Sequence, residues 1–471
     1  MTLSSSDRDR SSSAVPVVRR WYRADAARVV VLAIVLVAFV AAVYCPDLGR
    51  GFVKDDFTWI RTAQAAIAQP STVILQRDAG FYRPIVTLTF VTDYALHEWD
   101  SRGYGWTNLA LYILCVAAIV GLGLSIGLSR WAAALSAFLW AINPHGINMA
   151  LLWLSGRAAL LITLFSVVAG IAFVRRRYAM ATVPIALALL SKEEAVALPA
   201  ILLAWMWLRS RECGVPRIAI AAACVPLGVY LWMRSLTPAF TLATAPIFYQ
   251  FTTDPWVLLR NVGEYLDRSG SLVAMAVTIA IVVYRVLPSF DGTDRQALRM
   301  MTVWWVGMFA VTMWLPVRSS LYAVCPSVGT AIIGAVILER LRVNAIAGRF
   351  VLEPVLAMLL LAAIPIYQAR DRRRVEAARI SARTIGTIHS DLAMLAHAGS
   401  VVFHDDPDAS SFREAFGDLV SEALRVRFSR QWDARIENAQ PRSEPLVQRE
   451  LVAEYWIRRG RITRGSDRPL F

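Results

Sequence analysis

The fold is decided by the stretch VVVLAIVLVAFVAAVYC at residues 29–45, which carries no charged side chain. With its flanks it is long enough for one helix to cross a bilayer. No small-residue cleavage site follows, so we interpret it as a membrane span and not as a signal peptide. Similar apolar runs recur along the chain between short arginine-rich pieces. With 57% hydrophobic and 18% charged residues, the chain is not an ordinary soluble enzyme.

The apolar runs predict about eleven transmembrane helices, so the expected fold class is an all-α polytopic membrane protein. After the first span, the helices are expected near residues 107–128, 131–143, 158–174, 178–190, 195–208, 217–233, 271–287, 300–316, 320–338 and 350–367. The same pattern divides the chain into three parts. Residues 1–28 are polar and predicted to be a disordered cytoplasmic tail, residues 29–367 form the transmembrane domain, and residues 368–471 form a soluble appendage.

The appendage is predicted to be a small α/β unit. Residues 399–403 have the pattern of a short buried strand, and residues 411–427 have apolar side chains at helical spacing. Nothing in this segment indicates a particular chemistry.

The net charge of +14 is explained by topology and does not indicate a nucleic-acid partner. If the N-terminus is cytoplasmic, every arginine cluster between spans falls on the cytoplasmic side. The outer loops are then 46–106, 144–157, 191–194, 234–270 and 317–319. About eleven spans place the appendage outside, although the arginines at 370–374 favour the inside. The five cysteines have no zinc or disulfide spacing.

The first outer loop holds two adjacent acids, Asp55 and Asp56, directly after the first span. Helical spacing of Trp59, Ala63 and Ile67 predicts a surface helix that begins at these acids. The structural alternative is that one acid caps the helix and the other is solvated. The functional alternatives are a base that accepts a proton from an attacking hydroxyl, or a site for a divalent cation.

Cationic side chains stand in the same predicted outer loops. The sequence offers four candidates for a phosphate site: Arg83, Arg157, Lys192 and Arg318. Arg157 opens a span on the side where arginine is unusual, so it needs a carboxylate or phosphate partner. Lys192 interrupts two spans, where a tight polar turn is the alternative. Candidate supporting residues are Lys54, Tyr82, His145, Glu193 and Tyr322. For His145 both a structural and a catalytic role are open.

Together, two acids and several cations on one membrane face suit the attack of a hydroxyl on a sugar whose leaving group is a lipid phosphate. Aspartate removes the proton, and Lys or Arg neutralises the departing charge. The chain has no glycine-rich phosphate loop of the P-loop or Rossmann type.

The order of these motifs resembles the GT-C glycosyltransferases, closest to the protein O-mannosyltransferase-like branch that includes the transmembrane TPR-containing mannosyltransferases. The resemblance covers about residues 30–340 and rests on these segments: 52–56, 82–84, 155–161, 190–193, and Arg318 with Tyr322. It implies an inverting transferase that takes a sugar from a polyprenyl-phosphate donor on the extracytoplasmic face. It further implies Asp55 as the base, with Asp56 second, and donor-phosphate contacts from Lys192, Arg83 and Arg318.

The chain departs from that family in two places. The His-Pro-type segment is Asn143-Pro144-His145 here, and Asn148 stands where an acid is expected. No TPR array follows the spans. Metal use varies among GT-C enzymes, so a divalent cation is left open and no other cofactor is predicted.

Two other functions are compatible with the sequence. A transporter or flippase of lipid-linked sugar would also need cations, but it should place polar groups near mid-membrane. A ligase that moves a glycan from a lipid diphosphate differs mainly in its donor. High arginine and alanine usage favours a bacterial inner membrane as the location. The partners expected are membrane lipid, the lipid-linked sugar and an acceptor of unknown type.

Overall fold

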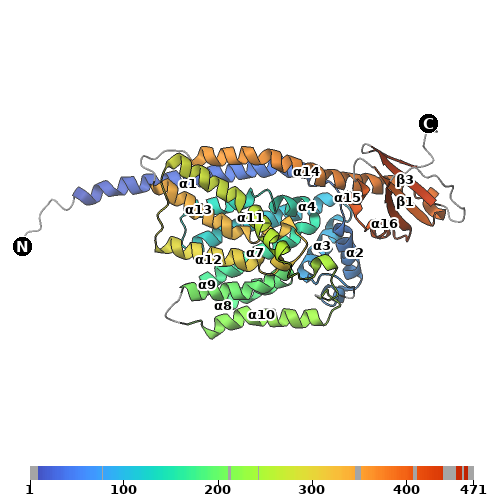
Figure 1. Cartoon of the computed structure of the whole chain (residues 1–471), viewed down its shortest axis with the longest axis horizontal. Coiled ribbons are helices and arrows are strands. Elements are labelled where there is room, and N and C mark those ends of the chain that lie inside the picture. The colour runs from blue at the N-terminus through green and yellow to red at the C-terminus, as the bar shows by residue number, and fades with distance from the viewer. Residues whose placement is uncertain are drawn as a thin grey trace, which may run out of the picture.

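The computed structural model describes residues 9–76, 78–209, 214–241, 243–344, 352–406, 411–438, 452–458 and 461–464. These residues form a helical bundle with a small sheet at one end (Figure 1). Every predicted span overlaps a helix of the bundle. These helices are α1 (Asp9–Val43), α4 (Ser101–Ser125), α5 (Arg130–Ala141), α7 (Arg157–Val174), α8 (Tyr178–Leu189), α9 (Leu198–Arg209), α10 (Arg217–Ser235), α11 (Pro255–Tyr284), α12 (Gly292–Phe309), α13 (Ser327–Asn344) and α14 (Leu352–Ser390).

Within the described residues, five helical segments are long and apolar enough to cross a membrane. They are Ala26–Asp47, Ser101–Ser125, Leu154–Val174, Arg217–Ser235 and Pro255–Tyr284. The predicted count of about eleven spans is therefore not confirmed. Some of the other helices are too short: α5, α8 and α9 have 12 residues each, which at 1.5 Å per residue falls well short of the hydrocarbon thickness. The five segments still indicate a membrane protein.

Two helices begin earlier than the sequence predicts. Helix α1 begins at Asp9, so residues 9–28 are helical where a disordered tail was expected. Their alanines and arginines have good helix propensity, which a reading based on polarity overlooks. Helix α11 begins at Pro255 and not near residue 271, because the Asp254 side chain accepts a hydrogen bond from the Trp256 amide and Pro255 occupies the first turn.

The bundle core is tightly packed around tryptophans. Trp205 of α9 stacks on Trp304 of α12 with ring centroids 5.5 Å apart. Their indole N–H groups donate to backbone carbonyls, so the polar atoms are satisfied. Gly329 lets α13 approach α12 closely, since a Cβ there would lie 2.7 Å from the Met301 carbonyl oxygen.

The C-terminal unit is a four-stranded sheet with two short helices, as the predicted α/β class requires. The strand order is β2-β1-β3-β4, with β1 parallel to both β2 and β3 and β3 antiparallel to β4. The strands are β1 (Ser400–Asp405), β2 (Asp433–Asn438), β3 (Val452–Arg458) and β4 (Arg461–Arg464). Strand β1 is central and fully buried. The single predicted helix is two, α15 (Phe412–Phe416) and α16 (Val420–Phe428), separated at Gly417 with φ +57°.

Helix α14 joins the bundle to this unit, and the expected boundary at residue 368 lies within that helix. The unit packs on α2 (Asp55–Ala68), the helix that follows the first span (Figure 1). Phe57 of α2 stacks on Phe416 of α15 at 5.8 Å, and both rings are fully buried. The Lys54 amide donates to the Ala415 carbonyl at 3.0 Å. The C-terminal unit therefore lies on the same side of the bundle as the first loop.

Candidate functional site

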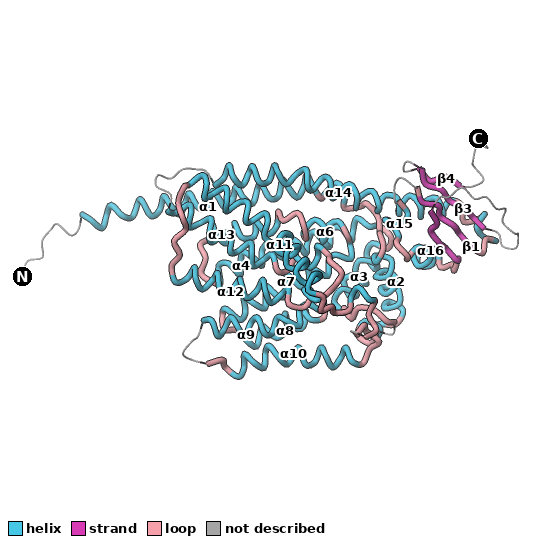
Figure 2. The backbone as a smooth tube through the Cα atoms, in the orientation of Figure 1, coloured by secondary structure: helices cyan, strands magenta, loops and turns pink. Residues whose placement is uncertain are grey.

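The segments predicted as outer loops gather at one end of the bundle, which we call the site end (Figure 2). Backbone hydrogen bonds connect them directly. Ile85 donates to Leu190, Phe240 to Gly80, and Val317 to Phe248. The site end also carries α2 and α3 (Pro84–His97). The fold thus brings these segments together at one end of the bundle.

The predicted surface helix of the first loop is α2, which begins at Asp55. Its buried face is formed by Asp56, Phe57, Ile60, Ala63 and Ala66. Lys54, the residue before it, has φ +47°, a conformation that a lysine rarely adopts. The hydrogen bond from its amide to Ala415 helps to hold that turn. The two acids are therefore displayed by a strained turn that the C-terminal unit supports.

The two aspartates have different surroundings. Asp56 is fully buried, and its carboxylate accepts hydrogen bonds from the Val53 amide at 2.9 Å and the Ser155 amide at 2.8 Å. It also accepts one from the Ser155 hydroxyl. Burial raises the pKa of Asp56 to about 6, against the opposing effect of these hydrogen bonds. Asp56 therefore joins the first loop to the segment before α7.

Asp55 is exposed, and its carboxylate lies in the electrostatic field of Arg83 and Lys54. The surrounding protein raises the pKa of Asp55 by removing water from around the charged form, and the two cations partly oppose that effect. Of the two acids, Asp55 is the one that an incoming molecule can reach.

Arg83 stands at the start of α3 and is paired with Glu193. The Arg83 Nε and one amino group donate to the two Glu193 carboxylate oxygens, the closest at 2.7 Å. Its guanidinium also covers the Phe81 ring at 4.2 Å. Although burial disfavours both charges, their attraction raises the pKa of Arg83 and lowers that of Glu193. The pair is therefore ionised, with the cation held in one orientation.

Lys192 is almost entirely buried and, like Arg83, is paired with an acid. Its Nζ lies 2.6 Å from a carboxylate oxygen of Glu194 and 4.8 Å from the centre of the Tyr322 ring. Burial raises the pKa of Tyr322, so its hydroxyl stays protonated. Lys192 and Tyr322, predicted separately from distant loops, thus contact each other.

Arg318 and His145 meet acids on α11. An amino group of Arg318 lies 3.0 Å from Glu264, which also binds Arg260 and Arg268. His145 Nε2 lies 4.0 Å from Asp267. Arg318 therefore belongs to an ion-pair group on α11. A short stretch of chain connects Arg318 to Tyr322, which contacts Lys192.

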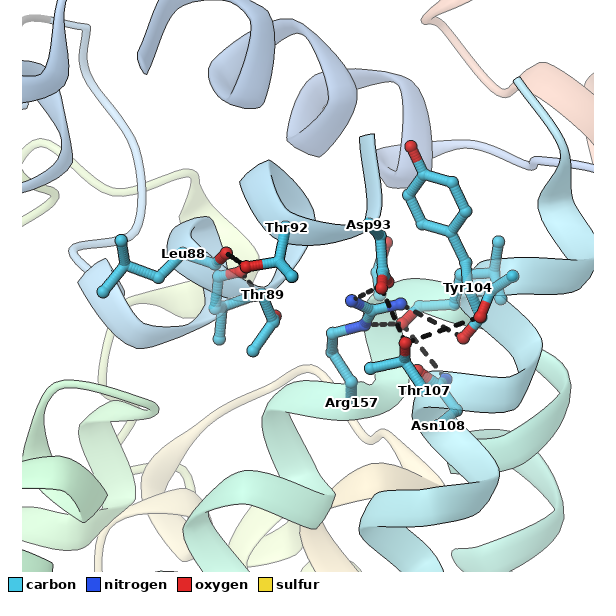
Figure 3. Close-up of polar contacts among 12 residues, drawn as sticks. Leu88, Thr89, Thr92, Asp93, Tyr104, Thr107, Asn108 and Arg157 are labelled. Atoms are coloured by element: carbon cyan, nitrogen blue, oxygen red, sulfur yellow. Dashed lines mark hydrogen bonds and ion pairs between the residues drawn. The ribbon is translucent and has the colours of Figure 1, made fainter. Parts of the chain in front are cut away.

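The sequence leaves two partners open for Arg157, a carboxylate or a phosphate. In the fold its partner is a carboxylate. Arg157 is fully buried and lies 2.5 Å from Asp93 of α3 (Figure 3). Its guanidinium also covers the Phe90 ring at 4.2 Å and donates to the Tyr104 carbonyl. This position gives Arg157 no exposed surface toward a ligand. Tyr82 is likewise fully buried, packed 6.1 Å from Tyr230.

Several residues of the site end were not found from the sequence. They are Asp93, Ser155, Glu194, Tyr249, Glu264 and Asp267. Asp93 gave a signal, because it stands inside an apolar run where a lone acid needs a partner. For Glu264 the spacing of Arg260 and Arg268 indicates pairs along one helix, but nothing local indicates the contact with Arg318. Within the described residues, no group of three or more His, Cys, Asp or Glu is placed to hold a metal ion.

Two hollows open near these residues. A groove of about 1200 Å³ runs between α1 and α14, with apolar walls such as Val35, Phe39 and Leu360. A smaller cavity of about 440 Å³ is lined by Lys54, His145 and Asn148 among others. The two share Ala377 and Glu414, so they adjoin at the site end.

The fold and this site define a membrane protein with an acid–cation cluster at one end of a helical bundle. No protein-family model matches the chain, and no solved structure gives a significant match. A curated protein O-mannosyl-transferase from Caenorhabditis elegans is 29% identical over 167 residues, which is 34% of this chain and 24% of that protein. The chain thus matches about a quarter of that relative's length. This similarity supports a mannosyltransferase-like relationship and suggests a membrane glycosyltransferase.

Proposed function

We propose that this chain is an integral membrane glycosyltransferase of the GT-C type. In the proposed reaction a hydroxyl acceptor attacks the anomeric carbon of a polyprenyl-phosphate sugar on the extracytoplasmic face. A new carbon–oxygen bond forms, the bond from that carbon to the phosphate oxygen breaks, and the configuration inverts. The acceptor proton passes to Asp55, and the lipid phosphate leaves with the bonding electrons.

The observation that carries the proposal is the exposed Asp55 in the electrostatic field of Arg83 at the site end. A base must reach the hydroxyl that it deprotonates, and Asp55 is accessible whereas Asp56 is enclosed by hydrogen bonds. The raised pKa of Asp55 also makes it a stronger proton acceptor than an ordinary aspartate. We therefore assign the base role to Asp55 and a positioning role to Asp56.

The leaving phosphate is assigned to Arg83, Lys192 and Arg318. Arg83 and Arg318 are paired with Glu193 and Glu264, which come from other segments, and Lys192 is paired with Glu194, two residues further along the chain. Arg83 uses its Nε and one amino group for Glu193, and its other amino group donates to no described residue. Such a held cation stabilises developing negative charge without having to reorganise.

Two further features support a lipid-borne donor and a transferase. The groove between α1 and α14 gives an apolar chain a path to the site end. The proposed site residues belong to segments that meet at that end of the bundle, whereas a transporter is expected to place its polar groups near mid-membrane.

The proposal is tested by Asp55→Asn in membranes supplied with a polyprenyl-phosphate sugar and acceptor. We expect transfer to fall by about a hundredfold or more, as is usual for loss of a general base. Asp78→Asn is the matched control, because Asp78 is an exposed acid of the same loop that pairs with Arg61. Asp78→Asn should transfer at the normal rate. Normal transfer by Asp55→Asn would remove Asp55 from the base role.

A further inference from the structure

The smaller cavity at the site end is enclosed by five parts of the chain. Lys54 comes from the first loop, Asn148 and Trp153 from the segment before α7, Ser320 from the segment before α13, Arg374 and Ala377 from α14, and Glu414 from α15 of the C-terminal unit. Lys54 immediately precedes the proposed base, Asp55, in the chain. Arg83 and Lys192 do not line it.

Asn148 is the informative residue of this cavity. It is 1% exposed, and neither its amide nitrogen nor its amide oxygen is hydrogen-bonded to a described residue. The buried indole N–H of Trp153 is in the same state. A buried polar group without a partner costs about 1–3 kcal/mol, so natural proteins rarely retain one without a function. Two such groups lining one cavity indicate that a ligand completes their hydrogen bonds.

The chemistry of the lining identifies the class of ligand. Asn148 offers both a donor and an acceptor, Trp153, Lys54 and Arg374 offer donors, and Glu414 offers an acceptor. Donors and acceptors at close quarters suit a compact molecule with many hydroxyl groups, because each hydroxyl both donates and accepts. A volume of about 440 Å³ fits a small ligand and not an extended peptide.

We propose that this cavity binds a sugar unit of the acceptor, with the Asn148 side chain as its central hydrogen-bonding contact. The assignment to the acceptor rests on the proposed function, since the cavity is lined by Lys54, the chain neighbour of Asp55, and by neither Arg83 nor Lys192. It makes the preferred acceptor a carbohydrate. The same sugar chemistry is present in the donor, and the test separates the two sources.

The test uses the full chain in lipid nanodiscs, with Asn148→Leu as the variant. Leucine has nearly the shape of asparagine, so it removes the unpaired amide without leaving a void. The first readout is the binding of a panel of methyl glycosides, measured by saturation-transfer NMR. We expect wild type to bind at least one glycoside and Asn148→Leu to bind it about tenfold more weakly or not at all. Asn344→Leu is the matched control at the other end of the bundle, where its amide contacts Ser289, and should bind like wild type.

Thermal unfolding of the same variants separates a ligand contact from a structural role. If the amide is unpaired until a ligand arrives, Asn148→Leu melts at the wild-type temperature or higher while glycoside binding is lost. A lower melting temperature, or glycoside binding equal to wild type, overturns the proposal.

Kinetics separate the two sugar sources. With the acceptor as occupant, Asn148→Leu raises the acceptor KM and leaves the donor KM unchanged. A raised donor KM with an unchanged acceptor KM overturns the acceptor assignment. Failure of the proposed function is distinct, because it appears as normal transfer by Asp55→Asn while glycoside binding still depends on Asn148.

Discussion

The adjacent residues Asp55 and Asp56 have different roles in this protein because their surroundings differ. Asp55 points into accessible space near Arg83, whereas Asp56 is buried against Ser155. The pair therefore separates into one residue for chemistry and one for positioning. Ser155 and Arg157, two residues apart, likewise hold the first loop and α3 to the same segment.

Asp56 gives a stability prediction that depends on pH. Its folded pKa, about 6, lies above the value of about 3.9 in an unfolded chain. The folded state therefore keeps the proton longer, and stability is lost as pH rises from about 4 through 6. The shift of about two units corresponds to about 3 kcal/mol. Measured by thermal unfolding between pH 4 and 7, wild type should lose stability relative to the non-titrating Asp56→Asn variant. A gain over that range would mean that its hydrogen-bond donors keep Asp56 ionised.

Arg157 gives a second prediction at this scale. Arg157→Met leaves the Asp93 carboxylate buried without its counter-charge, which costs about 3–5 kcal/mol. We expect a large drop in melting temperature, partly restored by the double change Asp93→Asn with Arg157→Met. The control is Arg260→Met, whose pairing with Glu264 is exposed and worth at most about 1 kcal/mol. Equal melting temperatures for the two arginine variants would argue against the buried pair.

At the scale of elements, the contact between α2 and α15 supports the proposed base. Phe416→Ala removes a fully buried ring that stacks on Phe57, at a cost of about 3–5 kcal/mol. We expect transfer to fall by about tenfold or more, because α2 loses the surface that positions Asp55. Limited proteolysis should also release the C-terminal unit faster.

The control for this change also joins α2 to the C-terminal unit. Glu422 of α16 forms a partly exposed ion pair with Arg61 of α2 at 3.0 Å. Glu422→Ala should cost less than about 1 kcal/mol and leave transfer near normal. If Phe416→Ala transferred sugar as fast as Glu422→Ala, the C-terminal unit would have no part in positioning α2.

How much could be predicted from the sequence depends on whether a feature is local. The bundle helices were predicted because each carries an apolar run, and Asp55, Arg83, Lys192 and Arg318 were selected as candidates because they stand beside or between those runs. The start of α11 was missed because a capping Asp254 sits in a polar stretch. The predicted number of spans is not confirmed, since an apolar run can form a helix too short to cross a bilayer.

Tertiary relationships were beyond the sequence. The acids that orient Arg83 and Arg318 come from other segments, and the distinction between Asp55 and Asp56 depends on Ser155 about a hundred residues away. Nothing local to the first loop shows that Phe416 covers its neighbour Phe57. The donor, the acceptor and the membrane face stay predictions.

At the scale of the whole molecule, the fold requires that the first loop and the C-terminal unit share one side of the membrane. In a cysteine-free background, single cysteines at the exposed positions 78 and 435 should react with an impermeant thiol reagent from the same side. A cysteine at position 287, exposed at the other end of the bundle, should react from the opposite side. Modification of 78 and 435 from opposite sides would contradict the packing of the C-terminal unit on α2.

That packing has a consequence for how the protein is made. The turn that displays Asp55 leaves the ribosome long before residue 416, whose ring covers its neighbour Phe57. Every intervening helix must be made before the early turn acquires its support. A nascent chain is therefore expected to be inactive until the segment around residue 416 has been synthesised and has packed on α2.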